Sequence, residues 1–215
     1  MRKLYNDILT FGNETVFGEH IAVCEGAAVM LHRLVKGNRE YQIADQNPSM
    51  MTQNRRTYMA ELGQTPCAVV VCCADSRVPT EHIFHAGLGE LFVIRNAGNV
   101  MGTYDLGSIE YAVEHLNVQL VLIMGHTNCG AVGSAMMNEV WSGALAEILK
   151  EVGLAIRDER DPREAERKNL IHSMKRLGES EILRELHQEG KVEFAGAIYD
   201  IRTGKVEFLG ENGEE

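Results

Sequence analysis

The fold of this chain is best approached from residues 67–77, CAVVVCCADSR, where an unbroken apolar run gives way at once to polar side chains. A short valine-rich run of this kind is typical of a strand that is buried on both faces. A second apolar run, Leu120–Met124, is followed closely by the motif HTNCG at His126–Gly130. In open α/β sheets, ligand sites form beyond the carboxyl ends of the strands. Both motifs lie at such ends, so we expect them to share one site.

Strands alternate with helices through the centre of the sequence, which favours a parallel sheet covered by helices on both faces. The strands are predicted at Ala68–Cys73, Leu91–Arg95 and Gln119–Met124. The helices that follow them are predicted after Pro79, around Leu106–Leu116 and after Gly130.

The flanking regions predict further helices and one hairpin. On the amino-terminal side, helical spacing indicates a helix from about Ile21 to Lys36, which we expect to stop at Gly37, and a second helix that ends at Gly63 after Leu62. On the carboxyl-terminal side, the charged stretch Ser142–Glu189 predicts surface and packing helices with a break near Asp161-Pro162, and Val192–Tyr199 with Lys205–Leu209 predicts a terminal hairpin.

These elements predict one α/β domain over residues 1–215, with a mostly parallel central sheet covered by helices. It would comprise an N-terminal arm of packing helices (1–62), a core that carries both motifs (66–141), and further helices with an antiparallel C-terminal strand or hairpin (142–215). A chain of 215 residues that is 45% hydrophobic is long enough for such a core.

Composition excludes several kinds of protein. The net charge of −10 argues against nucleic acid and anionic membranes as partners, and no apolar run approaches the roughly 20 residues that span a bilayer. The amino-terminal residues soon turn polar and acidic, so we expect a cytoplasmic protein without a secretory signal. The odd count of five cysteines argues against a disulfide framework.

Cys73, His126 and Cys129 offer two thiolates and one imidazole, the ligand types that Zn²⁺ prefers. Side chains alternate along a strand, so Cys73 leaves the strand end on the face opposite Cys72, and we assign Cys73 as the ligand and Cys72 to the core. His126 and Cys129 are close enough in sequence to bind one metal from a tight turn, which Gly125 and Gly130 would permit. Three ligands leave a fourth position for water or substrate, as in catalytic zinc sites.

Asp75 and Arg77 lie in the turn that follows Cys73. A carboxylate beside a zinc can bind the metal or accept a hydrogen bond from metal-bound water. Arg77 can hold that carboxylate away from the metal through a bidentate ion pair.

The pattern Cys-x-Asp-x-Arg followed by His-x-x-Cys-Gly resembles the β-class carbonic anhydrases. The resemblance extends from about Leu34 to Leu209 and includes further matching segments, namely Arg77–Pro79, Phe92–Asn96, Ser108–Val113 and Gly196–Asp200.

The resemblance implies an enzyme that interconverts CO₂ and bicarbonate with one Zn²⁺ per chain. It implies Cys73, His126 and Cys129 as metal ligands and Asp75 with Arg77 as the catalytic dyad. The substrate-binding positions that it implies are Gln64, Phe92, Tyr111 and the backbone N–H of Gly130. Pockets in the family form at a dimer interface, so it further implies a dimer or tetramer in which Gln64 and Tyr111 serve the neighbouring subunit's zinc.

Two other functions stay open from the sequence. One is hydrolysis of carbonyl sulfide or carbon disulfide on the same zinc scaffold. The other is a non-catalytic, zinc-stabilised interaction module, against which the Asp75–Arg77 pair argues because a structural zinc is normally closed by four protein ligands. Val70 stands where some members of the family carry a tryptophan of a regulatory bicarbonate site, so we do not expect that regulation here.

Overall fold

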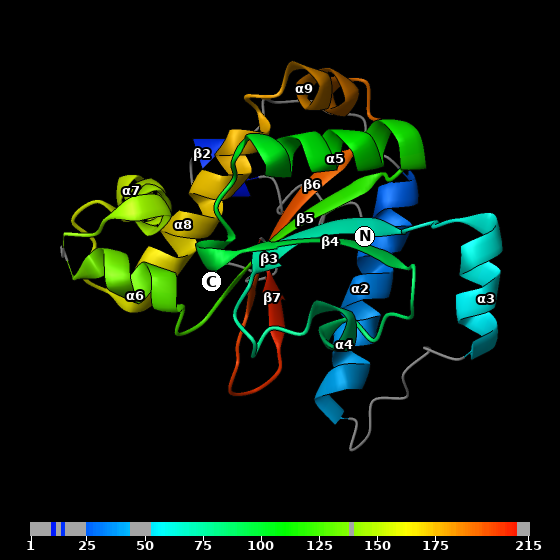
Figure 1. The fold of residues 1–215 in the computed structure, drawn as a ribbon, viewed down its shortest axis with the longest axis horizontal. Helices are drawn as coiled ribbons and strands as arrows, with labels where there is room; N and C mark the ends of the chain where they lie inside the picture. The colour runs from blue at the N-terminus through cyan, green and yellow to red at the C-terminus, as the bar shows by residue number, and fades with distance from the viewer. Residues whose placement is uncertain (1–9, 12–13, 16–24, 44–52, 138–139, 210–215) are drawn as a thin grey trace.

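A five-stranded sheet in the order β4-β3-β5-β6-β7 forms the centre of the protein (Figure 1). This computed structural model describes residues 10–11, 14–15, 25–43, 53–137 and 140–209. The strands of the sheet are β3 (Ala68–Cys73), β4 (Leu91–Asn96), β5 (Leu120–His126), β6 (Glu193–Tyr199) and β7 (Val206–Phe208), and a separate pair is formed by β1 (Thr10–Phe11) and β2 (Glu14–Thr15). All pairings in the five-stranded sheet are parallel except that of β6 with β7. The predicted mostly parallel sheet with an antiparallel C-terminal strand is therefore confirmed.

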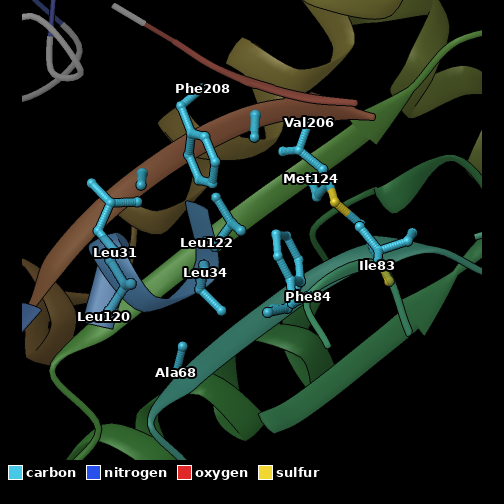
Figure 2. Close-up of a cluster of buried hydrophobic side chains, with 14 of the residues drawn as sticks. Leu31, Leu34, Ala68, Ile83, Phe84, Leu120, Leu122, Met124, Val206 and Phe208 are labelled. Carbon is cyan, nitrogen blue, oxygen red and sulfur yellow. The ribbon is translucent and has the colours of Figure 1, made fainter. Parts of the chain in front are cut away.

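One face of the sheet is covered by α2 (Glu25–Ile43) and α4 (Thr80–Ile83). Leu31 and Leu34 of α2 pack here against Leu120 and Leu122 of β5, as Figure 2 shows. Further side chains in this layer come from α4, its C-cap and β7, among them Ile83, Phe84, Val206 and Phe208. The N-terminal helix α2 is therefore a packing helix, as predicted.

The opposite face of the sheet is covered by α5 (Thr103–Leu116), α8 (Pro162–Leu177) and α9 (Glu181–Gln188) (Figure 1). The alternation of β3 divides its side chains between the two layers. Val69 and Val71 join this second layer, whereas Val70 and Cys72 join the first. Cys72 is thus a core residue, as predicted, and Cys73 leaves the strand on the side of Val69 and Val71.

The helix α2 continues past Gly37 to Ile43, so the predicted end at Gly37 is wrong. Gly37 has a packing role instead, because a Cβ there would fall on the carbonyl oxygen of Phe84. The second predicted end is correct: α3 (Gln53–Leu62) stops at Gly63, which has a positive φ of 81°. No residue of α3 is buried against the described part of the chain, and the predicted starts of both helices lie outside the described residues.

The charged carboxyl-terminal region forms α7 (Gly143–Ile156), α8 and α9. The predicted break is real, because Asp161 caps α8 by accepting hydrogen bonds from the N–H groups of Arg163 (2.8 Å) and Glu164 (3.0 Å), with Pro162 at the first helical position. Of these predicted surface and packing helices, α8 is a packing helix, since it buries seven residues, three of them polar. Among the described residues, no helix is both long and apolar enough to span a bilayer.

Two glycines in helices allow a matched test of this packing. Gly37→Ala should destabilise the protein by about 1–3 kcal/mol, because the new methyl group must displace the Phe84 backbone. Gly153→Ala, in α7, should be neutral or stabilising by up to about 1 kcal/mol, because outside its own helix backbone no atom of the described residues lies within 4 Å of its Cβ position. Urea unfolding of both variants measures the difference, and equal stabilities would contradict the close approach at Gly37.

Candidate metal centre and active site

The two motifs meet because β3 and β5 are neighbours in the sheet, with Cys72 opposite Met124. Cys73 is the last residue of β3, and His126 is the last residue of β5. Cys129 follows as the N-cap of α6 (Gly130–Met136), after a turn in which Asn128 has a positive φ of 56°. The end of β5 therefore lies two residues beyond its predicted end at Met124.

Cys73, His126 and Cys129 bring three possible ligand atoms within 4.8 Å of one another. All three side chains are buried, with exposed fractions of 5%, 1% and 5%. Burial of an imidazole beside two thiol groups is unfavourable unless something satisfies their polar atoms. The structure thus brings together the three residues that the sequence singled out for a metal.

The orientation of His126 supplies a further test of that fit. Its Nδ1 lies 3.0 Å from the carbonyl oxygen of Thr127, and since a carbonyl can only accept, Nδ1 carries the proton. Its Nε2 is buried and finds no hydrogen-bond partner in the described part of the chain. A histidine with one nitrogen anchored to the backbone and a free lone pair on the other is suited to metal binding. The donor set, one nitrogen and two sulfurs, suits zinc.

The two thiols act on each other. A hydrogen bond from the Cys129 thiol lowers the pKa of Cys73, against the opposing effect of burial. The same shared proton raises the pKa of Cys129, and burial raises it further. The Gly98 N–H also donates to the Cys73 sulfur at 3.3 Å. Both sulfurs must be thiolates to bind a metal, and a bound cation would stabilise that charge.

Asp75 and Arg77 form the predicted bidentate pair. The Arg77 Nε donates to Asp75 Oδ1 at 2.9 Å and its terminal nitrogen to Oδ2 at 2.7 Å, while the Arg77 backbone N–H also donates to Oδ1 at 2.9 Å. These bonds hold the pKa of Asp75 well below its usual range. Arg77 also donates to the Asn128 carbonyl at 3.2 Å, so the pair links the two motif loops.

Arg95 fixes the backbone of the same turn from β4. Its guanidinium donates to the carbonyl oxygens of Cys73 (3.3 Å) and Asp75 (2.8 Å). This contact was not predicted from the sequence.

Cys72 is separated from this site although it adjoins Cys73 in sequence. Its side chain is fully buried and its sulfur lies 2.9 Å from the Thr80 hydroxyl oxygen. Burial raises the pKa of the Cys72 thiol to about 11, so this cysteine stays protonated and unreactive. Cys67, Cys72, Cys73 and Cys129 are all free thiols, and Cys24 lies outside the described residues.

The residues assigned to substrate lie in two places. Gly130 adjoins Cys129 and is exposed, and outside its own helix backbone no atom of the described residues lies within 4 Å of its Cβ position. Gln64 is exposed and lies before β3, at the end of the strand away from Cys73. Phe92 pairs with Val69 near the beginning of β4, with its ring centroid 6.4 Å from that of Tyr111. At about 3.3 Å per residue, Val69 lies roughly 13 Å before Cys73 along β3, so one chain does not bring Phe92 to its own centre.

The sequence alone missed residues of α8 that contact the segments around the proposed metal ligands. Glu166 accepts the Cys129 N–H at 3.2 Å, and Asn169 donates to the Gly98 carbonyl at 2.8 Å. Burial raises the pKa of Glu166, against the opposing effect of the Cys129 and Asn128 N–H groups. The available signal was the spacing of polar residues along α8, a stretch for which the sequence predicted only surface and packing helices.

Comparisons with known proteins agree with this geometry. A family model described as carbonic anhydrase matches residues 68–206. Carbonic anhydrase 2 of Mycobacterium tuberculosis is 34% identical over 200 residues, which cover 85% of this chain and 94% of that protein.

Two solved structures are also similar. A β-carbonic anhydrase of Aspergillus fumigatus is 31% identical, with a TM-score of 0.63 over 75% of this chain and 83% of its own. One of two tetrameric β-carbonic anhydrases from Sordaria macrospora has a TM-score of 0.66 at 24% identity, over 85% of this chain and 95% of its own, a likeness of fold. From the family match and the extent of these relatives, this chain belongs to the carbonic anhydrase family, in its β class.

Proposed function

We propose that this protein catalyses the reversible hydration of CO₂ to bicarbonate and a proton, with one Zn²⁺ per chain held by Cys73, His126 and Cys129. Family membership supports the reaction. The single observation that carries the assignment to these residues is the convergence of three buried donor atoms within 4.8 Å, beside the Asp75–Arg77 pair. The comparisons give no support to the two alternatives, the carbonyl sulfide or carbon disulfide hydrolase and the non-catalytic zinc module.

The chain supplies the surroundings in which this reaction can occur. A bound Zn²⁺ would supply the Lewis acidity that activates water, as it does in the three-histidine carbonic anhydrases. The Nδ1–H···O bond of His126 keeps Nε2 free for the metal. Gly130 is exposed beside Cys129, and we assign its backbone N–H to contact with the substrate.

Asp75 is the residue that we assign to orienting the reacting water. Its lowered pKa keeps it ionised, so that it accepts hydrogen bonds and does not donate them. Arg77 fixes both of its oxygens and so holds the carboxylate in one orientation. We assign to Arg77 the second task of keeping Asp75 away from the metal.

We further propose that the chain self-associates as a dimer or tetramer, and that the Gln64 and Tyr111 of one copy serve the zinc of another. Three observations support this proposal. The similar Sordaria macrospora enzyme is tetrameric, β4 is an edge strand of the sheet, and Tyr111 remains 47% exposed in a single chain. We also propose a cytoplasmic location, which the four free thiols support.

The ligand assignment is tested by replacing each proposed ligand cysteine, and the neighbouring Cys72, with serine. Cys73→Ser and Cys129→Ser should each lose most of the bound zinc and with it the CO₂ hydration measured by stopped flow, because a hydroxyl is a poor zinc ligand. Cys72→Ser should retain zinc and activity, because a serine hydroxyl can still reach Thr80. Full zinc occupancy in Cys73→Ser, measured by elemental analysis, would refute the assignment.

The dyad is tested by breaking it from either side. Arg77→Ala frees Asp75 to approach the metal, and Asp75→Asn removes the charge. We expect both variants to keep zinc and to lose about 10- to 100-fold in hydration rate, the usual effect of losing a group next to a metal centre.

Lys191→Ala is the control, since it breaks the exposed ion pair with Glu189 and should leave the rate unchanged.

The lowered pKa of Asp75 keeps the wild-type dyad ionised at any pH above about 4, the ordinary range for aspartate. The stability that the ion pair contributes is therefore present above that pH and is lost only as the pH falls through the lowered pKa. If both dyad variants hydrate CO₂ at the wild-type rate at neutral pH, with zinc fully bound, the pair is only a salt bridge within the turn and has no role in the reaction.

Self-association is tested by light scattering. The 23.9 kDa chain should elute at twice or four times that mass, and Gln64→Ala should lower hydration without affecting zinc content. An active monomer would remove the proposed contribution of Gln64 and Tyr111 across an interface.

A further inference from the structure

One face of α8 carries three polar side chains that are almost wholly buried. Glu166, Asn169 and Ser173 follow one another at i, i+3 and i+7, the spacing of a single helical face. Their exposed fractions are 6%, 2% and 1%. Polar groups at such depth destabilise the fold unless they are hydrogen-bonded, so their partners indicate what they do.

Asn169 and Ser173 bind the loop that follows β4. Asn169 Nδ2 donates to the carbonyl of Gly98 at 2.8 Å, and the Ser173 hydroxyl donates to that of Asn99 at 2.9 Å. These two loop residues, in η1 (Ala97–Asn99), both have a positive φ, of 75° and 45°. A backbone in this region needs its neighbours to hold it, above all at a residue other than glycine.

The loop that α8 holds in turn contacts a proposed zinc ligand. The N–H of Gly98 donates to the sulfur of Cys73 at 3.3 Å. Gly98 also has little space, because a Cβ there would come within 3.0 Å of the Ala131 side chain and 3.3 Å of that of Val152. The Asn169 amide therefore holds Gly98 by its carbonyl group, while the N–H of the same residue donates to the Cys73 sulfur.

Glu166 contacts the other cysteine directly. Its Oε1 accepts the Cys129 N–H at 3.2 Å, whereas its Oε2 is buried and finds no hydrogen-bond partner among the described residues. A buried carboxyl group that is only half satisfied destabilises the fold. An apolar side chain would be better for stability alone, so the contact with Cys129 is the feature that explains Glu166.

The helix α8 packs directly on β5 close to the carboxyl end of that strand. At Gly125, a Cβ would lie 3.6 Å from that of Leu170 and 3.9 Å from the carbonyl oxygen of Glu166. Figure 1 shows α8 between the sheet and α7. One helix thus contacts both the loop that donates a hydrogen bond to the Cys73 sulfur and the turn that carries Cys129.

We propose that this face of α8 positions both thiolates of the metal centre: Asn169 and Ser173 act on Cys73 through the Gly98 N–H, and Glu166 acts on the Cys129 turn. The inference rests on the metal site proposed above. Groups that orient metal ligands typically change metal affinity or activity by about 10- to 100-fold when they are removed. Asn169, Ser173 and Glu166 are positioning residues, since they reach the metal only through Cys73 and Cys129.

Cobalt and a zinc chelator provide two measurements that do not depend on activity. Co²⁺ replaces zinc in the purified full-length protein, and its thiolate charge-transfer and d–d absorption bands report the geometry of the two sulfurs. Competition with a chelator measures how strongly zinc is retained. The variants are Asn169→Leu and Glu166→Leu, which remove a hydrogen-bonding group at similar size, and Ser173→Ala with its conservative counterpart Ser173→Thr.

We expect Asn169→Leu and Glu166→Leu to shift the cobalt bands and to weaken zinc retention by about 10-fold or more. Ser173→Ala should change both in the same direction by less, and Ser173→Thr should restore them. Met174→Ala is the matched control, because Met174 lies on the same helix, fully buried in the apolar layer. It should lower the unfolding temperature and leave the cobalt bands and zinc retention as in wild type.

Two results would overturn the inference, and they differ from each other. In the first, wild type shows thiolate-to-cobalt bands, and every α8 variant that folds, Ser173→Ala included, keeps both these bands and the zinc retention of wild type. In that case α8 only packs against the site, and the metal site itself stands. If wild type itself lacks these bands, the proposed metal site fails and the inference fails with it.

Discussion

The register of β3 against β5 is the constraint on which the rest of the site depends. Val69 to Cys72 pair in parallel with Val121 to Met124, so the two strands end side by side. Because side chains alternate, a slip of one residue would exchange Cys72 and Cys73 between the two faces of the sheet. Cys72 would then approach the metal centre and Cys73 would enter the apolar core, which would remove one ligand of the proposed zinc.

Contacts beyond the strands hold that register. The Cys72 sulfur lies against the Thr80 hydroxyl in the core, and Arg95 of β4 binds the carbonyl oxygen of Cys73. The Arg77 guanidinium then connects the loop after β3 to that after β5 through Asn128. The centre is thus built from short turns that are hydrogen-bonded to one another and hold three buried ligand side chains, which suits a metal that must keep one position open.

The sequence was sufficient to predict the parallel sheet and the three converging residues. The reason is that continuous apolar strands have a strong local signal and that sites in such sheets form at the carboxyl ends. It was insufficient where tertiary contacts decide. Gly37 ends no helix because its missing side chain admits the Phe84 backbone, a contact between residues 47 positions apart.

The role of α8 could not be predicted for a related reason. Glu166 and Asn169 are polar, and polar residues on a charged helix usually face solvent. Only their partners, the Cys129 N–H and the Gly98 carbonyl, show that this face is buried against the metal loops. Sequence spacing alone does not distinguish a solvated polar face from one that binds a loop backbone.

The central claim is that two sulfurs and one imidazole of a single chain hold a zinc ion with one position left open. X-ray absorption at the zinc edge of the purified protein tests it most directly. We predict two sulfur neighbours at about 2.3 Å, one imidazole nitrogen at about 2.0–2.1 Å, and one further light atom. A shell of four sulfurs, or one with nitrogen and oxygen alone, would contradict the account.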